Sequence, residues 1–205
     1  TEQALVDLLD NPVNEQAVNI AKRKAVEVLG RLGTSSSISK IGQCLWSEDN
    51  YLVENAVFAL KQLKCNDPQL IAKIIDLLKD NKYNQRVLIQ CLSSLSVKEC
   101  LATVQVLKKS ESPGIRGAAI SADVQLSGRR EQLSVVADHL LLPNQMDRQC
   151  AIQDLIDAQA VEYLPSIVAS PVSPAFRIRA CRLLLNSQDH QSVLMKSIHL
   201  SLIHI

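Results

Sequence analysis

Apolar residues recur along the chain at helical spacing, and the arrangement itself returns every 31 or 32 residues. One segment has a small residue, Ala25, followed by Leu29 and Leu32. Related segments begin near residues 56, 88, 119, 151 and 180. The copy near 119 is weaker because Asp123 interrupts its apolar pattern. A helical repeat of this length predicts stacked supersecondary units.

Each copy is preceded by a further amphipathic segment and a short polar turn. Residues 68–78 are the clearest example, because Asp67 is placed to cap a helix and Pro68 suits its first position. The apolar stripe of this segment consists of Leu70, Ile71, Ile74, Ile75, Leu77 and Leu78.

The pattern predicts an all-α fold, an α-solenoid of about six HEAT-like helical hairpins. One hairpin cannot bury its own apolar face, so neighbours must stack, and we expect the second helices to line a concave surface. We expect one array over 1–199, and the lack of an obvious polar cap at either end suggests a fragment of a longer array. The predicted hairpins cover 1–33, 36–65, 67–97, 98–128, 130–158 and 160–187.

Composition narrows the class of protein. Apolar residues make up 47% and aromatic residues only 3%, which is typical of a helical protein. The 22 basic and 21 acidic residues nearly cancel, which argues against nucleic acid as a partner. No apolar run is long enough to span a membrane. Six cysteines without a C-x-x-C motif indicate free thiols in a reducing compartment, hence a cytoplasmic location.

The last six residues, Leu200 to Ile205, read L-S-L-I-H-I. This string resembles the translation of a sequencing adaptor, so we expect residues 200–205 not to be native.

The chain carries no nucleophile elbow, P-loop, zinc-protease motif or metal-ligand spacing. We therefore predict no metal site. His139, His190 and His199 have no matched partner in sequence, which favours a place on a helix surface or at the edge of the core.

Charge recurs where the second helices start. One interpretation is structural, with acids in the turns pairing with helix arginines to hold hairpins together. The other is a cationic strip that clamps carboxylates, for which Arg177, Arg179 and Arg182 are the densest cluster. The basic residues are Lys22, Arg23, Arg86, Arg116, Arg148, Arg177, Arg179 and Arg182, and the turn acids are Asp10, Glu48, Asp49, Asp80 and Glu111.

In the fifth second helix, Ala151 and Leu155 align with core positions. Asp154 is then expected to face the groove, with Asp157 close by. These carboxylates are either part of a solvated surface or contacts for a cationic or proton-bearing ligand, and periodicity alone leaves both open.

Several segments together resemble the HEAT-repeat bilin lyases of phycobilisome biogenesis, in particular the phycocyanobilin and phycoerythrobilin lyases of the E/Y type. The likeness covers nearly all of residues 17 to 187. The segments are A-K-R-K-A-V-E-V-L-G-R-L, Y-L-V-E-N-A-V-F-A-L, Q-R-V-L-I-Q-C-L, C-A-I-Q-D-L-I-D-A and P-V-S-P-A-F-R-I-R-A-C-R-L-L.

The resemblance implies an enzyme that binds a phycobilin and joins it by a thioether to a cysteine of a phycobiliprotein subunit. The bilin is a substrate, no separate cofactor is implied, and a second HEAT-type subunit is a plausible partner. Asp154 or Asp157 would serve catalysis beside the pyrrole nitrogens, while arginines hold the propionates. The candidate ligand-binding residues are Arg177, Arg179, Arg182, Arg86, Tyr51 and Glu54.

Other functions share these repeats. HEAT solenoids are often non-catalytic protein-binding scaffolds, and fold alone does not imply function. A phycobilisome assembly or disassembly factor, or an enzyme that isomerises the bilin while attaching it, would show the same pattern.

Overall fold

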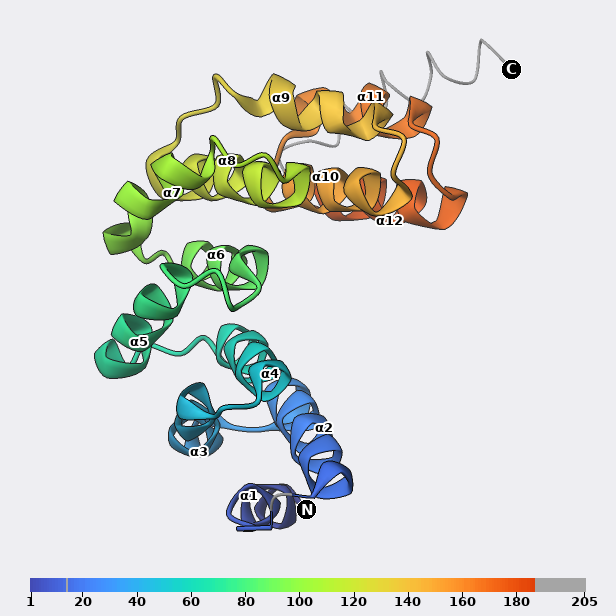
Figure 1. Cartoon of the computed structure of the whole chain (residues 1–205). Coiled ribbons are helices and arrows are strands. Elements are labelled where there is room, and N and C mark those ends of the chain that lie inside the picture. Colours follow the sequence, from blue (N-terminus) through green and yellow to red (C-terminus); the bar gives the residue numbers. More distant parts are fainter. Residues whose placement is uncertain (14, 187–205) are drawn as a thin grey trace. The chain divides into compact units, whose positions relative to one another are not determined.

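The computed structural model of the chain describes residues 1–13 and 15–186 (Figure 1). Within these ranges the chain forms twelve α-helices, short 3-10 segments and no strand. The prediction of an all-α fold built from helical hairpins is confirmed. The predictions for His190, His199 and residues 200–205 lie outside the described residues.

The chain divides into two compact units, Thr1–Thr103 and Val104–Ile205. The prediction of one continuous array over 1–199 stays a prediction.

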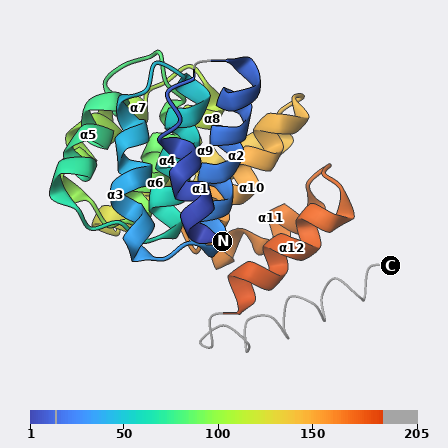
Figure 2. The ribbon, with the colours of Figure 1, turned by 90° about the horizontal axis from the view of Figure 1, so that it is seen from below.

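Unit 1 contains three hairpins, each with a first helix packed on a second one. Within this unit α2, α4 and α6 pack in succession, and α1, α3 and α5 pack against them (Figures 1 and 2). The helices are α1 (Glu2–Leu9), α2 (Gln16–Leu32), α3 (Ile38–Gln43), α4 (Asn50–Gln62), α5 (Pro68–Leu78) and α6 (Gln85–Ser94).

Close approach between second helices depends on small residues. A Cβ at Gly30 of α2 would lie 2.7 Å from Cα and Cβ of Ala59 on α4, closer than two carbons can stand. Both residues are buried, so glycine at position 30 allows two neighbouring hairpins to share one apolar core.

The predicted start signal of α5 is confirmed. Asp67 caps the helix by accepting hydrogen bonds from the backbone N–H groups of Gln69 at 2.8 Å and Leu70 at 3.2 Å. Pro68 occupies the first turn. Leu70, Ile74, Leu77 and Leu78 are buried, while Ile71 and Ile75 are partly buried at the edge of the stripe.

Three second helices end in the left-handed conformation without a glycine. Lys64, Ser96 and Gln159 have φ angles of 52°, 59° and 49°. The residue after each of them donates a backbone hydrogen bond to the carbonyl five residues back, as Cys65 N does to Leu60 O at 3.0 Å. These three second helices therefore end in the same backbone motif, which the amino-acid composition does not reveal.

Unit 2 contains the remaining second helices, α8, α10 and α12, with α10 packed between the other two. Its core gathers large apolar side chains such as Leu140, Leu155 and Leu184. The helices are α8 (Pro113–Ser127), α9 (Leu133–Asp138), α10 (Gln145–Asp157), α11 (Leu164–Ala169) and α12 (Pro174–Leu185); α7 (Leu101–Leu107) contains the boundary between the units.

All six cysteines are free. Burial raises the pKa of Cys44 and Cys100 to about 11 and that of Cys91 to about 12, so these thiols behave as small apolar side chains. No helix in the described part of the chain is both long and apolar enough to cross a membrane.

Replacing Asp67 by Ala removes the α5 cap and should lower the free energy of unfolding by about 1 kcal/mol. Trp46 is the one tryptophan of the sequence and lies in unit 1, so its fluorescence during urea unfolding measures the effect. Asp76→Ala is the control, because this exposed residue of α5 only pairs with Lys79 and its loss should cost less than about 0.5 kcal/mol. Equal losses in the two variants would contradict the assigned cap.

Candidate functional site

The arginines at the starts of second helices in unit 2 bind backbone carbonyls. Each donates to the end of its hairpin's first helix or to the turn that follows, which holds the hairpin closed. The contacts are Arg116 Nη1 to Ser110 O at 2.8 Å, Arg148 Nη1 to Leu142 O at 2.6 Å, and Arg177 Nη1 to Val168 O at 2.8 Å.

The predicted pairing of turn acids with helix arginines is found in unit 1. Arg23 donates through Nε and Nη2 to the two carboxylate oxygens of Asp49, at 2.7 and 2.9 Å. The structural interpretation therefore accounts for Arg23, Arg116, Arg148 and Arg177, although carbonyls replace carboxylates in three of the four.

Asp154 does not face solvent, contrary to the expectation from periodicity. Its exposed fraction is 1%, and its Oδ2 occupies the space beside Gly117 of α8. A Cβ at position 117 would lie 2.5 Å from this oxygen and 3.6 Å from Nδ1 of His139. The missing side chain of a glycine lets a carboxylate from the neighbouring helix enter, which the apolar pattern of α10 alone could not predict.

His139 is buried and its protonation state follows from its partner. Arg116 approaches Nε2 through Nε at 3.3 Å and Nη2 at 3.1 Å. A guanidinium has only donors, so Nε2 accepts and the ring proton is carried by Nδ1, on the side of Gly117. Burial and the charge of Arg116 lower the pKa of His139 despite opposing effects of Asp147 and Asp138, so the imidazole is neutral at pH 7.

Asp157, in the last turn of α10, is half-buried. Gln153 donates to its Oδ1 at 2.7 Å, so the two polar side chains lie together one turn apart. On α12, Arg182 occupies the repeat position of Gln153 and is exposed, as is Arg179. Because α10 and α12 pack together, this face of unit 2 offers a carboxylate, an amide and guanidinium groups.

An apolar hollow of about 280 Å³ is lined by Arg177 and its neighbours in unit 2. It is formed by α11 and α12, and Ile178, which lines it, is 68% exposed. Its lining residues are Val168, Pro174, Arg177, Ile178 and Cys181.

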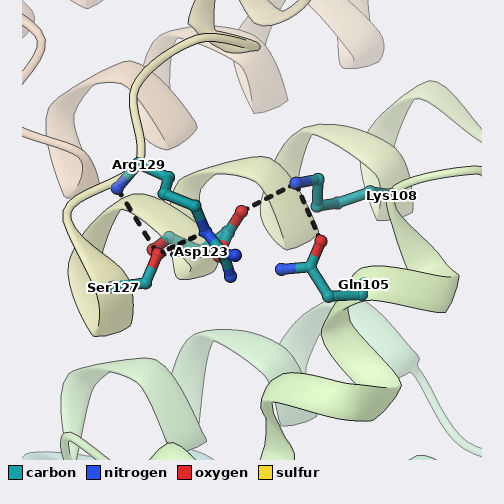
Figure 3. A network of polar contacts seen from close by, with 5 residues as sticks. All are labelled: Gln105, Lys108, Asp123, Ser127 and Arg129. Carbon is teal, nitrogen blue, oxygen red and sulfur yellow. Dashed lines mark hydrogen bonds and ion pairs between the residues drawn. The ribbon is translucent and has the colours of Figure 1, made fainter.

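Asp123, which interrupts the repeat pattern, is the centre of a buried ion network (Figure 3). Lys108 Nζ contacts its Oδ2 at 2.7 Å, and Arg129 Nη2 contacts its Oδ1 at 2.8 Å. Ser127 Oγ adds a hydrogen bond of 2.9 Å. Burial alone would raise the pKa of Asp123, but these donors lower it to about 2, so the charged network stabilises the hairpin of α7 and α8.

The other candidate residues lie in unit 1. Tyr51 and Glu54 belong to the exposed side of α4, and Arg86 is a half-buried residue of α6 that has a polar partner. Among the described residues, no group of three or more histidine, cysteine, aspartate or glutamate side chains could hold a metal ion.

Sequence reasoning missed the pairing of Gly117 with Asp154 and His139. A signal was present, because the positions equivalent to Gly117 in other repeats carry large residues such as Arg23, Glu54 and Ile178. A glycine inside a helix costs about 1 kcal/mol relative to alanine, so its presence there indicates a packing requirement.

Gly117→Ala should lower the free energy of unfolding by about 1–3 kcal/mol, because the new Cβ displaces a buried carboxylate. In an Asp154→Ala background the same change should instead stabilise by about 1 kcal/mol through helix propensity. Chemical denaturation of the four proteins of this cycle measures the coupling. Stabilisation by Gly117→Ala in the parent chain would show that Asp154 does not occupy this space.

The lowered pKa of His139 predicts a loss of stability in acid. The unfolded chain takes up a proton below the ordinary pKa of 6.5, whereas the folded chain resists it, so stability falls as the pH drops through and below that value. His139→Gln keeps an acceptor for Arg116 without titrating, so its stability should vary less between pH 7 and pH 5. If the free energy of unfolding changed with pH equally in parent and variant, the lowered pKa of His139 would be contradicted.

Comparison with known proteins bears on all of these features. No family model matches the chain. The chain is 46% identical, over 89% of its length, to the bilin biosynthesis protein CpeY of a Synechococcus species, and it spans 44% of that protein. It is 30% identical, over 83% of its length, to the phycocyanobilin lyase subunit alpha of Thermosynechococcus vestitus, of which it spans 66%.

A solved structure supports the fold. The complex of CpcE and CpcF of phycocyanin lyase from a Nostoc species contains a chain that superposes with a TM-score of 0.81 at 20% identity, over 91% of this chain and 75% of the other. The fold and the sequence relatives agree with the resemblance noted in the repeats. The chain belongs to the HEAT-like phycobilin lyase family.

Proposed function

We propose that this chain acts in a phycobilin lyase that binds a linear tetrapyrrole and attaches it by a thioether to a cysteine of a phycobiliprotein subunit. The observation that carries the proposal is the 46% identity to a bilin biosynthesis protein along 89% of the chain. The chain spans less than half of the length of that relative, so the activity of a whole protein of this kind is proposed for it.

The exposed face of α10 and α12 suits the substrate chemically. A bilin carries two propionates on a conjugated, largely apolar body. Arg179 and Arg182 are exposed and suit the propionates, whereas the guanidinium of Arg177 is directed to Val168 O. The hollow lined by Ile178 and Cys181 offers apolar surface for the body.

Asp154 and Asp157 of α10 take different roles in this proposal. Asp157 is half-buried and is the one that would contact the pyrrole nitrogens. Asp154 is buried beside Gly117 and His139, so it would support the helix from behind. A carboxylate near the pyrrole nitrogens favours their protonated form, which makes the conjugated system more electrophilic.

The nucleophile is supplied by the acceptor protein. Its thiol sulfur bonds to one carbon of a double bond of the bilin, and the thiol proton ends on the bilin, so no oxidant or reductant is required. The contribution of the lyase is then to orient the two partners and to control protonation.

The partners follow from the same proposal. We expect a phycobiliprotein subunit as acceptor and a second HEAT-type subunit in the active assembly, as the subunit name and the two-protein complex of the relatives suggest. The free thiols suit a cytoplasmic location. A non-catalytic scaffold or a phycobilisome assembly or disassembly factor is the alternative, and it predicts no bilin binding by this chain.

Co-expression with a bilin-producing system and an apo-phycobiliprotein, with and without a second lyase subunit, should yield a coloured acceptor that survives denaturing electrophoresis. The proposal also predicts that Arg182→Gln and Arg179→Gln each weaken binding of free phycocyanobilin about tenfold to a hundredfold, since a charge-assisted hydrogen bond contributes about 1.5–3 kcal/mol.

Arg130→Gln is the matched control, because this arginine of unit 2 is also exposed but pairs with Glu162. It should bind bilin as the parent does. If the parent chain neither binds bilin nor supports a coloured acceptor, the scaffold alternative is correct.

A further inference from the structure

Two of the three tyrosines of the chain stand at the same repeat position, 32 residues apart. Tyr51 lies in the first turn of α4, and Tyr83 lies in the turn just before α6. Both belong to unit 1, where α4 and α6 pack against each other. In a chain with only 3% aromatic residues, this repetition places aromatic rings along one edge of two adjacent hairpins.

Tyr51 is exposed and is nevertheless held in place. Its ring is 65% exposed, and the guanidinium carbon of Arg23 lies 4.8 Å from the ring centroid. Arg23 is fixed by its two hydrogen bonds to Asp49. Asp49 Oδ1 in turn accepts from the backbone N–H groups of Tyr51 and Leu52, at 3.1 and 3.3 Å.

One carboxylate therefore orients both the aromatic residue and its cation. Burial alone would raise the pKa of Asp49, but the hydrogen bonds from Arg23 and Leu52 hold it below its ordinary value. The group stays ionised throughout the neutral range. An exposed tyrosine fixed in this way loses little conformational entropy when something stacks on it.

The second tyrosine is connected to the first across the two helices. Glu54, one turn after Tyr51, accepts a hydrogen bond of 3.3 Å from the backbone N–H of Asn84, the residue that follows Tyr83. Tyr83 carries its own cation, with Lys82 Nζ 5.5 Å from the ring centroid. The ring of Tyr83 is partly buried, unlike that of Tyr51.

We propose that Tyr51 and Tyr83 form a two-ring stacking edge for the conjugated pyrrole rings of a linear tetrapyrrole, with Arg23 and Asp49 as its positioning residues. This inference rests on the proposed function and adds a subsite in unit 1. Two aromatic platforms one hairpin apart suit a ligand made of several planar rings in series. Lys82 beside Tyr83 attracts a ligand that also carries carboxylates, whereas the charge of Arg23 is balanced by Asp49.

The test measures binding of phycocyanobilin to the full chain through its absorption spectrum and through quenching of Trp46. Tyr51→Leu and Tyr83→Leu keep apolar volume but remove the ring, and each should weaken binding about three- to tenfold. Tyr51→Phe keeps the ring and should bind as the parent does. Asp49→Asn should weaken binding in the same direction as Tyr51→Leu, while its far-ultraviolet circular dichroism stays that of the parent.

Met146→Leu is the matched control, because Met146 occupies the equivalent repeat position in unit 2, is 64% exposed and is not aromatic. Its bilin affinity should be unchanged. If the parent binds bilin and both tyrosine-to-leucine variants bind equally well, the stacking edge is overturned while the proposed function stands. If those variants keep bilin affinity but lose the phycobiliprotein subunit in a pull-down, the edge docks a protein instead. A parent chain that binds no bilin overturns the stacking edge, and one that also supports no coloured acceptor overturns both proposals.

Discussion

The structure depends on one constraint, that a single helical hairpin cannot bury its own apolar face. The second helices must therefore pack directly on their neighbours. Gly30 against Ala59 shows how closely they do so in unit 1. The arginines at the helix starts serve the same constraint, because Arg116, Arg148 and Arg177 close their hairpins on backbone carbonyls. Hairpins that are closed in this way leave the exposed faces of the second helices available for function.

A repeat protein contains its own comparison, and the positions that depart from the repeat are informative. Asp123 and Asp154 place carboxyl groups where other copies carry apolar or small residues. Lys108 and Arg129 pair with Asp123, and Gly117 leaves the space that Asp154 fills. Such buried polar groups fix how adjacent helices fit. Tyr51 departs in the opposite way, because it is a large aromatic residue left exposed.

Much of the fold could be predicted because its determinants are local. Periodicity and turn residues gave the hairpins, and Asp67 with Pro68 gave the start of α5. The site was less predictable, because it depends on contacts between residues far apart in sequence. Asp154 fills space left by the absent side chain of Gly117 on another helix, and His139 is paired with an arginine 23 residues away. Neither partner is visible in the apolar pattern of its own helix, and the family resemblance carries no information on it.

Hydrogen–deuterium exchange of the chain with and without phycocyanobilin shows whether the ligand binds on the exposed side of the second helices. Bound bilin should slow exchange around the starts of α4 and α6 and along α10 and α12, and should leave α3, α5 and α9 unchanged. Protection confined to those first helices, or none at saturating bilin, would contradict binding on that side.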